Sequence, residues 1–400
     1  MSTELNSPET VLADAKAILG DLVRFDTTSR NSNLVLVEWV EDYLLRFGVA
    51  TQRIYDPTGK KSNLLATIGP LDVPGYVLSG HTDVVPVDGQ DWTSDPFTLM
   101  ERDGRLYGRG ACDMKGFLAA CLAQVPAMVA EPLARPIHLA FSYDEEVGCI
   151  GVRSMIAELA DRQAQPLACF VGEPTSMNVV VGHKGKRSQR VVVTGRACHS
   201  SLAPKGVNAV HAACRIVARI ADLADELAAK GARDPMFDVS HSTAHVGALK
   251  GGTALNIVSD HAEFIYEIRV VGADDVDALV GQIEAYAQDT LLPAMRAVAP
   301  EADIVFEDLS EFPGLDIAPD HAAVTLAKKL AGKNGHSKVA YGTEAGLFMV
   351  RGGIPSVIIG PGDIEQAHKP DEYLAVSELA SACAFVGRLV AQARQPVGGA

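Results

Sequence analysis

Short apolar segments alternate with helical segments through most of this chain, and this alternation is the strongest constraint on its fold. The apolar segments read NLLATIG, YVLSG, IHLAFS, ACFVG and PSVIIG, and helical stretches such as MKGFLAACLAQVPAMVA separate them. Parallel strands need a long crossover between them, which a helix usually supplies. We therefore expect an α/β fold with a mostly parallel central sheet and helices on both of its faces.

The chain opens with the signals of an amphipathic helix. Ser7 stands at the N-cap position and Pro8 at the first helical position. Apolar residues then recur at helical spacing: Val11, Ala15, Ile18, Leu19, Leu22 and Val23. At the other end, the tail QPVGGA is predicted to be disordered.

A second pattern occupies residues 183–312. Here RSQRVVVTGRA reads as a strand, GVNAVHAACRIVARIADLADELAAK as a helix, STAHVGALKG and SDHAEFIYEIRVVG as strands, DVDALVGQIEAYAQDTLL as a helix and EADIVFEDL as a strand. The order βαββαβ is that of a ferredoxin-like α+β module. Because the apolar α/β pattern resumes afterwards, we predict that residues 1–182 and 313–400 form one domain into which residues 183–312 are inserted. A chain of 400 residues, 48% of them hydrophobic, is large enough for both cores.

Charge and hydropathy restrict the partners. The formal net charge is −15 and no basic cluster occurs, which argues against nucleic acid. An acidic chain favours a substrate that carries a cation, although acidity also simply confers solubility. The segment MSTELNSPETVLADAKAILG lacks the basic start and apolar centre of an export signal, and no stretch of about 18 residues is free of polar interruption. We expect neither export nor a membrane span.

The cysteines do not form a metal or redox motif. They are seven in number, namely Cys112, Cys121, Cys149, Cys169, Cys198, Cys214 and Cys383. Their number is odd and no CxxC pair occurs, so neither zinc binding nor redox chemistry by thiols is indicated. We expect buried free thiols in a reducing cytoplasm.

Polar side chains follow the predicted strands at the point where each strand ends. They are His81 and Asp83 after YVLSG, Glu145 and Glu146 after IHLAFS, Glu173 after ACFVG and, beyond a loop, His368 after SVIIG. Asp113, in GRGACDMKG at the start of a helix, adds another carboxylate. Because sites in open α/β sheets form at the carboxyl ends of the strands, we expect these side chains to meet at one edge.

Each of these signals also has an ordinary structural explanation. A single histidine after a strand is more often a hydrogen-bonded structural residue, adjacent glutamates are usually a solvated loop, and an aspartate before a helix is usually a cap. Convergence on one edge favours a metal site instead. Two imidazoles with three carboxylates supply three negative charges and a bridging hydroxide a fourth, which balances two divalent ions. Such ligands without thiolate indicate two zinc ions, with cobalt or manganese as alternatives, and no HExxH motif occurs.

Five ordered motifs carry a resemblance to a known family. SGHTDVVP, GRGACDMKG, DEEVG, GEPT and GPGDIEQAHKPDEY resemble the signature of the M20 family of di-zinc metallopeptidases, which includes exopeptidases, aminoacylases and deacylases. The resemblance implies that His81 and Glu173 bind the first zinc, that Glu146 and His368 bind the second, and that Asp113 bridges both. It also implies a cis peptide bond after Asp113.

Two further carboxylates have expected roles beside the ligands. Asp83 lies two residues after His81 and thus on the same side of an extended chain, where it is expected to accept the other ring N–H of that histidine and fix its tautomer. Glu145 cannot face the same way as its neighbour Glu146. It is therefore free to take a proton from water and return it to the leaving amine, as general base and then general acid.

The inserted domain contributes candidates through the resemblance alone. His199, Asn256 and Arg269 match lid-domain positions that help to polarise the scissile carbonyl and bind the substrate carboxylate. The resemblance also implies a homodimer formed through the inserted domains, with His199 acting across its interface. Simpler explanations exist: His199 as the cap of a turn with the two serines that follow it, and Arg269 as an edge-strand charge facing water.

The stretch YGTEAGLFMVRGGIPSVIIGPGDIEQAHKPDEY most resembles the acetylornithine deacetylase branch of the family. That branch implies hydrolysis of an N-acyl amino acid, with N2-acetyl-L-ornithine first. Such a small molecule has one carboxylate suited to Arg269 and one distant ammonium suited to Glu344. Other specificities stay open, namely a neutral aminoacylase, an acetylcitrulline deacetylase, a succinyl-diaminopimelate desuccinylase or a dipeptidase.

Two readings from other classes are weaker. A binding protein that has lost catalysis should have lost a ligand or the base, and here the whole set is present. A dinucleotide or phosphate enzyme is disfavoured because no GxGxxG follows the first strand and no Walker pattern exists.

Overall fold

The computed structural model describes residues 7–396 and divides the chain into two compact units. The first unit consists of Met1–Gly182, Leu315–Lys338 and Thr343–Ala400, and the second of His183–Gly314 and Val339–Gly342. The insertion predicted for residues 183–312 corresponds to the main part of the second unit. The end of the tail predicted to be disordered, residues 397–400, lies outside the described residues.

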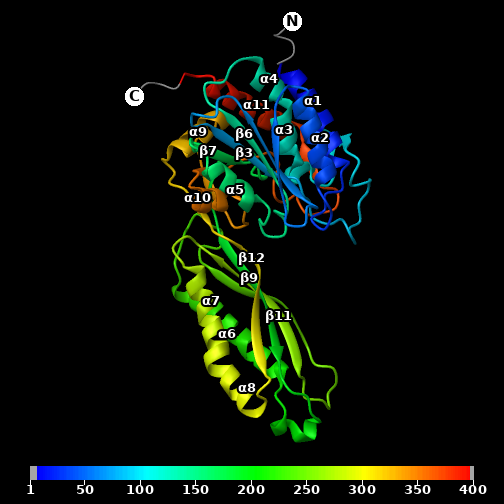
Figure 1. Ribbon diagram of the computed structural model, residues 1–400, viewed down its shortest axis with the longest axis vertical. Helices are drawn as coiled ribbons and strands as arrows, with labels where there is room; N and C mark the ends of the chain where they lie inside the picture. The colour runs from blue at the N-terminus through cyan, green and yellow to red at the C-terminus, as the bar shows by residue number, and fades with distance from the viewer. Residues whose placement is uncertain (1–6, 397–400) are drawn as a thin grey trace. The chain divides into compact units, whose positions relative to one another are not determined.

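A nine-stranded sheet forms the centre of the first unit and confirms the predicted α/β fold (Figure 1). Its order is β1 (Thr51–Tyr55), β2 (Ser62–Ile68), β6 (Ile137–Ser142), β3 (Tyr76–His81), β7 (Ala168–Val171), β15 (Ser356–Ile358), β8 (Val180–His183) and β13 (Leu315–Asp316), with β14 (Ser337–Val339) beside β8. The central strands β6, β3, β7 and β15 are mutually parallel. Strands β3, β6 and β7 are buried along their whole length, as their continuous apolar sequences predict.

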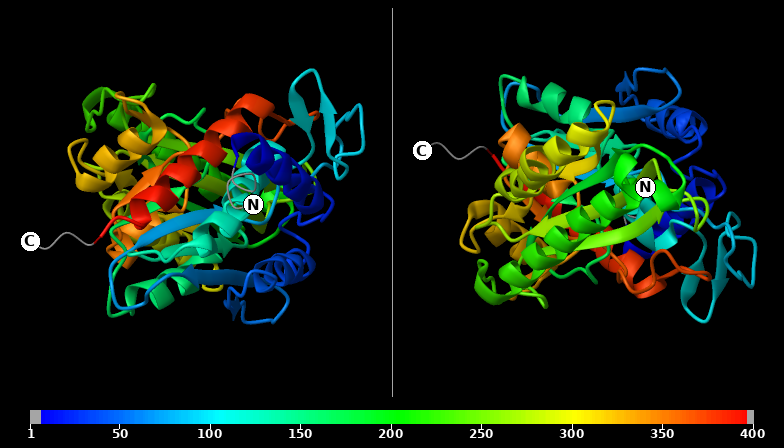
Figure 2. Two further views of the ribbon diagram at one scale, coloured as in Figure 1. Left: turned by 90° about the horizontal axis from the view of Figure 1, so that it is seen from above. Right: turned by 90° about the horizontal axis from the view of Figure 1, so that it is seen from below.

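Helices cover both faces of this sheet. One face carries α1 (Pro8–Val23), α2 (Leu34–Leu45), α3 (Gly116–Ala123), α4 (Val125–Ala130), α9 (Ala322–Ala331) and α11 (Val376–Ala393), whose apolar residues share one core with the strands. The other face carries α5 (Val152–Ala160) and α10 (Ala345–Gly352), which pack against each other. In Figure 2, left, α11 (red) and α5 (green) lie on opposite sides of the strands. Helix α1 begins as predicted, since Ser7 Oγ accepts a hydrogen bond from the backbone N–H of Thr10.

The helical segment predicted over residues 114–130 is interrupted. It begins with an irregular turn at Ala111–Lys115 and continues as α3, and α4 starts separately at Val125. Pro126 explains the second break, because it has no N–H to continue the hydrogen-bond ladder of α3. The stretch Ala111–Ala130 is long and apolar enough to cross a membrane, but 83% of its most apolar window is buried inside the protein, as in a helix at the centre of a folded core.

A small three-stranded sheet was not predicted. It consists of β16 (Tyr373–Ala375), β5 (Arg105–Tyr107) and β4 (Met100–Arg102), in that order and antiparallel. Pairing of β5 with β16 brings the segment that follows residue 107 next to the segment that precedes residue 373. This sheet therefore places two of the predicted ligand-bearing loops beside each other.

The second unit has the predicted order βαββαβ (Figure 1). Its antiparallel sheet runs β10 (Thr243–Gly251), β11 (His261–Val270), β9 (Gly185–Thr194) and β12 (Asp303–Phe312). One face packs against α6 (Ala209–Lys230), α7 (Val276–Ala285) and α8 (Leu292–Val298), with irregular turns at Ser200–Lys205 and Tyr286–Leu291. The apolar residues of these helices and strands form a core separate from that of the first unit.

Candidate metal centre

Parallel strand ends bring the predicted ligands to one edge of the first unit's sheet. His81 is the last residue of β3, and Glu173 follows the end of β7 by two residues. Glu146 lies in the loop after β6, and His368 lies in the loop after β15. Asp113 belongs to the irregular turn that leads into α3, and its peptide bond to Met114 is cis, as the resemblance implies. All five side chains belong to the first unit.

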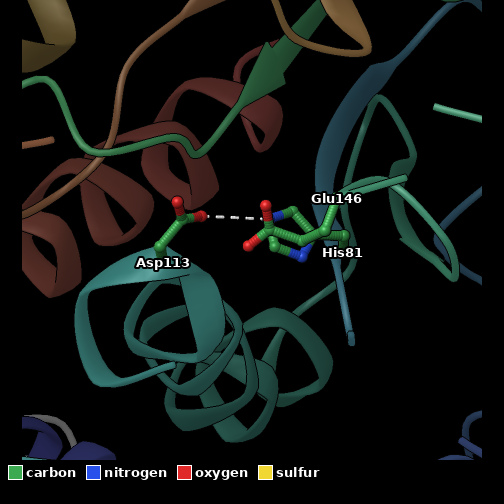
Figure 3. A group of neighbouring side chains, drawn as sticks. All are labelled: His81, Asp113 and Glu146. Atoms are coloured by element: carbon green, nitrogen blue, oxygen red, sulfur yellow. Dashed lines mark hydrogen bonds and ion pairs between the residues drawn. The ribbon is translucent and has the colours of Figure 1, made fainter. Parts of the chain in front are cut away.

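The Asp113 carboxylate lies between the two histidines. Its Oδ1 is 3.0 Å from Nε2 of His81, and its Oδ2 is 3.3 Å from Nε2 of His368. Figure 3 shows the carboxylate directed toward His81 and Glu146, with the His81 contact dashed. Asp113 and His81 are buried, whereas the His368 side chain is about half exposed. The carboxylate thus presents one oxygen to each histidine.

The remaining carboxylates complete two groups of ligand atoms. Nε2 of His368 is 3.1 Å from Oε2 of Glu146, and the ligand atoms of His81, Asp113 and Glu146 all lie within 4.8 Å of one another. A second group within 4.8 Å consists of His81, Glu145 and Glu173. Oε1 of Glu173 is buried and, within the described part of the chain, has no hydrogen-bond partner. A cation beside His81 satisfies this oxygen, so these side chains fit the implied metal ions.

Burial and crowding perturb the acids of the cluster. Burial, reinforced by neighbouring carboxylates, raises the pKa of Glu145 and of Glu173 well above the usual range, and it raises the pKa of Glu146 to about 7. Burial also acts to raise the pKa of Asp113, but hydrogen bonds with His368 and His81 outweigh it and hold that pKa below the usual range. A bound divalent cation favours the ionised form of every one of these groups, so the cluster is electrostatically suited to hold one.

Asp83 has a different contact from the predicted one. Nδ1–H of His81 donates to the backbone carbonyl of Asp83, at 2.8 Å, whereas the nearest carboxylate oxygen of Asp83 is 3.6 Å from the same nitrogen. The carboxylate instead accepts hydrogen bonds from the hydroxyl of Ser29 and from the backbone N–H groups of Glu145 and Glu146. The histidine tautomer is fixed with Nε2 toward the cluster, but by the backbone, and the Asp83 side chain orients the loop that carries the two glutamates.

Glu145 lies between Asp83 and a thiol. Its backbone N–H is held by Oδ1 of Asp83, and its Oε1 accepts a hydrogen bond of 3.2 Å from Sγ of Cys149. From the sequence, Cys149 was expected only to be a buried free thiol. A side-chain contact between residues four apart in a loop gives no recognisable sequence pattern, so the contact with Glu145 could not be predicted. The structure therefore adds Cys149 to the neighbours of the predicted general base.

Glu344 does not have the surroundings predicted for it. The side chain is 1% exposed, and its carboxylate accepts hydrogen bonds from Ser142 at 2.5 Å and from Ser79 at 3.4 Å. Both serines lie in strands of the central sheet, so the carboxylate faces the interior of the unit. The predicted contact with a substrate ammonium is not supported, because no oxygen of Glu344 faces solvent. Burial raises the pKa of this carboxyl to about 7.

The three candidates from the inserted domain belong to the second unit. His199 is exposed and caps the turn Ser200–Lys205, with its Nδ1 2.8 Å from the hydroxyl of Ser201. Asn256 is also exposed and lies beside it, since the backbone N–H of Ser200 donates to the carbonyl of Asn256. Arg269, in β11, is paired with Glu267 through a hydrogen bond of 2.7 Å. The structure brings His199 and Asn256 together, and their contact with the metal ligands stays a prediction.

Comparison with known proteins agrees with this geometry. The profile of peptidase family M20/M25/M40 matches residues 77–392. Acetylornithine deacetylase of Proteus mirabilis is 34% identical over 371 residues, which cover 91% of each chain, and that of Klebsiella pneumoniae is 36% identical over 349 residues, which cover 86% of each. An M20 family metallo-carboxypeptidase from Sulfolobus solfataricus superposes with a TM-score of 0.76 over 94% of this chain and 98% of its own, at 18% identity, which shows the shared fold. The chain is therefore a metal-dependent hydrolase and belongs to peptidase family M20/M25/M40.

Proposed function

We propose that this protein hydrolyses the amide bond of an N-acyl amino acid, with N2-acetyl-L-ornithine as the substrate and L-ornithine and acetate as the products. The observation that carries the proposal is the Asp113 carboxylate, whose two oxygens face His81 and His368. The choice of substrate is supported by the relatives, which are acetylornithine deacetylases 32–36% identical to this chain.

The proposed ligand set is the one that the family resemblance implies. His81 and Glu173 would hold one ion, Glu146 and His368 would hold the other, and Asp113 would serve both; the contacts of Asp113 with His81 and of His368 with Asp113 and Glu146 support this set. We propose zinc, with cobalt or manganese as alternatives, because the ligands are imidazoles and carboxylates without thiolate. When bound, two divalent ions polarise the acyl carbonyl and lower the pKa of water to about 7.

Glu145 moves the proton in the proposed reaction. Its carboxylate accepts a proton from the attacking water, and the carboxylic acid then gives that proton to the α-nitrogen of the substrate as the C–N bond breaks. The two transfers leave Glu145 as it began. The hydrogen bond from its backbone N–H to Asp83 holds the loop in place.

Residues of the second unit are proposed to complete the site. His199 and Asn256 polarise the acyl carbonyl, and Arg269 binds the substrate carboxylate. We propose a homodimer through the second unit, with His199 acting across its interface, and a cytoplasmic enzyme of arginine biosynthesis. Mixing His199→Ala with Glu145→Gln protein tests the interface role, because hybrid dimers should regain part of the activity. No recovery with hybrids shown to form contradicts that role.

A substrate panel tests the proposal as a whole. Initial rates of the zinc-loaded and cobalt-loaded protein are measured with acetylornithine, acetylcitrulline, acetylmethionine, succinyl-diaminopimelate and a dipeptide, beside a chelated control. We expect a chelator-sensitive rate with acetylornithine as the best substrate. A neutral or succinylated substrate as the best one contradicts the proposed specificity and leaves the metal centre standing. No hydrolysis of any of them contradicts the proposed reaction.

A further inference from the structure

A buried carboxylate outside the ligand set organises the Asp113 turn. Glu372 is 1% exposed, and its Oε1 accepts hydrogen bonds from the backbone N–H groups of Cys112, at 2.9 Å, and Asp113, at 3.0 Å. Its Oε2 accepts from the backbone N–H of Gly110, at 3.1 Å, and from Nη1 of Arg109, at 2.5 Å. One side chain thus holds the backbone on which the bridging carboxylate is carried.

Arg109 extends this contact toward the other ligand loop. The side chain is fully buried and lies over the Trp92 ring, with Cζ 5.0 Å from the ring centroid. Its Nη2 donates to Oε1 of Gln90 at 2.6 Å, and the indole N–H of Trp92 donates to the same oxygen at 2.9 Å. Because the guanidinium of Arg109 is planar and rigid, it holds the Glu372 and Gln90 side chains at a fixed separation.

Gln90 closes the connection to the second histidine. Its Nε2 donates to the backbone carbonyl of His368 at 3.1 Å. The segment is held a second time at Asp371, whose Oδ1 accepts from the backbone N–H of Thr93 at 2.9 Å and from its hydroxyl at 3.0 Å. Both His368 and Asp371 have positive φ angles, 61° and 55°, a conformation that non-glycine residues keep only where their surroundings impose it.

We propose that Gln90, Arg109 and Glu372 are positioning residues that form a brace between the Asp113 turn and the His368 loop. The brace sets the separation of the two ligands and so the affinity of the metal position that they share with Glu146. This inference rests on the ligand roles proposed above. It assigns no contact with substrate to any of the three side chains.

The buried ion pair between Arg109 and Glu372, at the centre of the brace, is expected to position the metal ligands rather than to stabilise the fold. Removing two charges from water costs about as much as their attraction returns, so a buried Arg–Glu pair is poor evidence of added stability. A small displacement of a ligand, in contrast, lowers the metal affinity directly, because loss of a contact that orients a metal ligand reduces that affinity about 10- to 100-fold.

The experiment compares stepwise metal binding in the metal-free protein. Wild type, Gln90→Ala and Arg109→Lys are titrated with Co²⁺ against a competing chromophoric chelator, and the Co²⁺ absorption spectrum is recorded at each step. Gln90 is only partly buried, so its substitution is compatible with folding, and the Tm of the metal-free protein verifies this. Arg53→Lys is the matched control, since Arg53 pairs with Glu41 in the same unit away from the ligands.

We expect Gln90→Ala to weaken the step that fills the position of Glu146 and His368, taken as the second step, about 10- to 100-fold and to alter its spectrum, with the first step nearly unchanged. Arg109→Lys should weaken the second step more than the first, because lysine lacks the rigid planar fork with which the guanidinium contacts Gln90 and Glu372. Arg53→Lys should bind both ions as the wild type does. Raising the Co²⁺ concentration should restore kcat in Gln90→Ala, which a general loss of folding would not allow.

Two results overturn the brace: a second step that is unchanged in both variants, or two steps weakened to the same extent in Gln90→Ala. Either result can be distinguished from a failure of the proposed function. A wild-type protein that binds fewer than two ions contradicts the dinuclear site itself. Failure to hydrolyse acetylornithine contradicts the substrate and leaves the binding result intact.

Discussion

Replacing Glu344 by glutamine should make the protein less sensitive to rising pH. The wild-type carboxyl is 1% exposed and is contacted by two serine hydroxyls. Burial raises its pKa from the ordinary value of 4.5 to about 7, although the hydrogen bond from Ser142 opposes the change. The folded protein therefore holds this proton more tightly than the unfolded chain does.

The sign and size of the effect follow from that difference. A raised pKa in the folded state contributes stability that is fully present below about pH 4.5 and is lost as the pH rises through about 7. Since one pKa unit is worth about 1.4 kcal/mol, the loss amounts to about 3 kcal/mol for this single carboxyl. Glutamine has a similar shape and no charge, so the variant should not lose this part of its stability.

The assay is urea unfolding of the metal-free protein at several pH values between about 4.5 and 8. Tryptophan fluorescence reports on the relevant part of the chain, because both tryptophans, Trp39 and Trp92, belong to the first unit together with Glu344. The free energy of unfolding of Glu344→Gln minus that of the wild type should rise by about 3 kcal/mol across this range. Glu365→Gln, at an exposed position of the same unit, is the control and should show no such rise.

A constant difference between Glu344→Gln and the wild type at all pH values refutes the reasoning. It would mean that the carboxylate remains ionised in the folded protein throughout the range. The serine hydroxyls would then compensate its charge far better than two hydrogen bonds normally do.

Three further predictions concern the metal centre. Glu145→Gln should lower kcat about 10²- to 10⁴-fold while both ions stay bound, as measured by initial rates and metal analysis; loss of an ion would exchange the roles of Glu145 and Glu146. Asp113→Asn should weaken both steps of Co²⁺ binding, because its two oxygens face both histidines, and an unchanged first step would show that it does not bridge. Affinity for Co²⁺ should rise between about pH 6 and 9, because protons compete with the metal for its ligands. Burial raises the pKa of Glu146 to about 7, and hydrogen bonds with Asp113 and Glu146 raise the pKa of His368 to about 10. An affinity that does not change with pH would contradict this competition.

The convergence of the proposed ligands on one edge of the sheet was predictable because apolar segments mark where strands end. His81 ends β3 and Glu173 follows β7, so their positions on one edge of the sheet required only the assignment of the strands. The insertion was predicted for a similar reason, as the order of strands and helices changes along the chain. Each of these inferences depends on residues that are near in sequence to the element that positions them.

What could not be predicted depends on contacts between distant segments. The three-residue strands β4, β5 and β16 are too short to show a period, so the small sheet and the contacts of Glu372 were missed. Glu344 was predicted to contact a substrate ammonium because nothing local indicates that two strand serines would surround it. The Asp83 contact was assigned to the right histidine but the wrong atom, because sequence spacing does not separate a carboxylate from the carbonyl of the same residue.

The order in which the chain is made affects when the metal centre can exist. Strand β15 lies between β7 and β8 in the sheet, yet it is synthesised after the whole second unit, and His368 follows it. A nascent chain that stops before residue 356 has an unfilled gap in its central sheet and lacks one of the two histidines. Until then β7 and β8 have unpaired edges, which are prone to wrong pairing. The proposed uptake of two ions thus requires a chain that has been extended past residue 368.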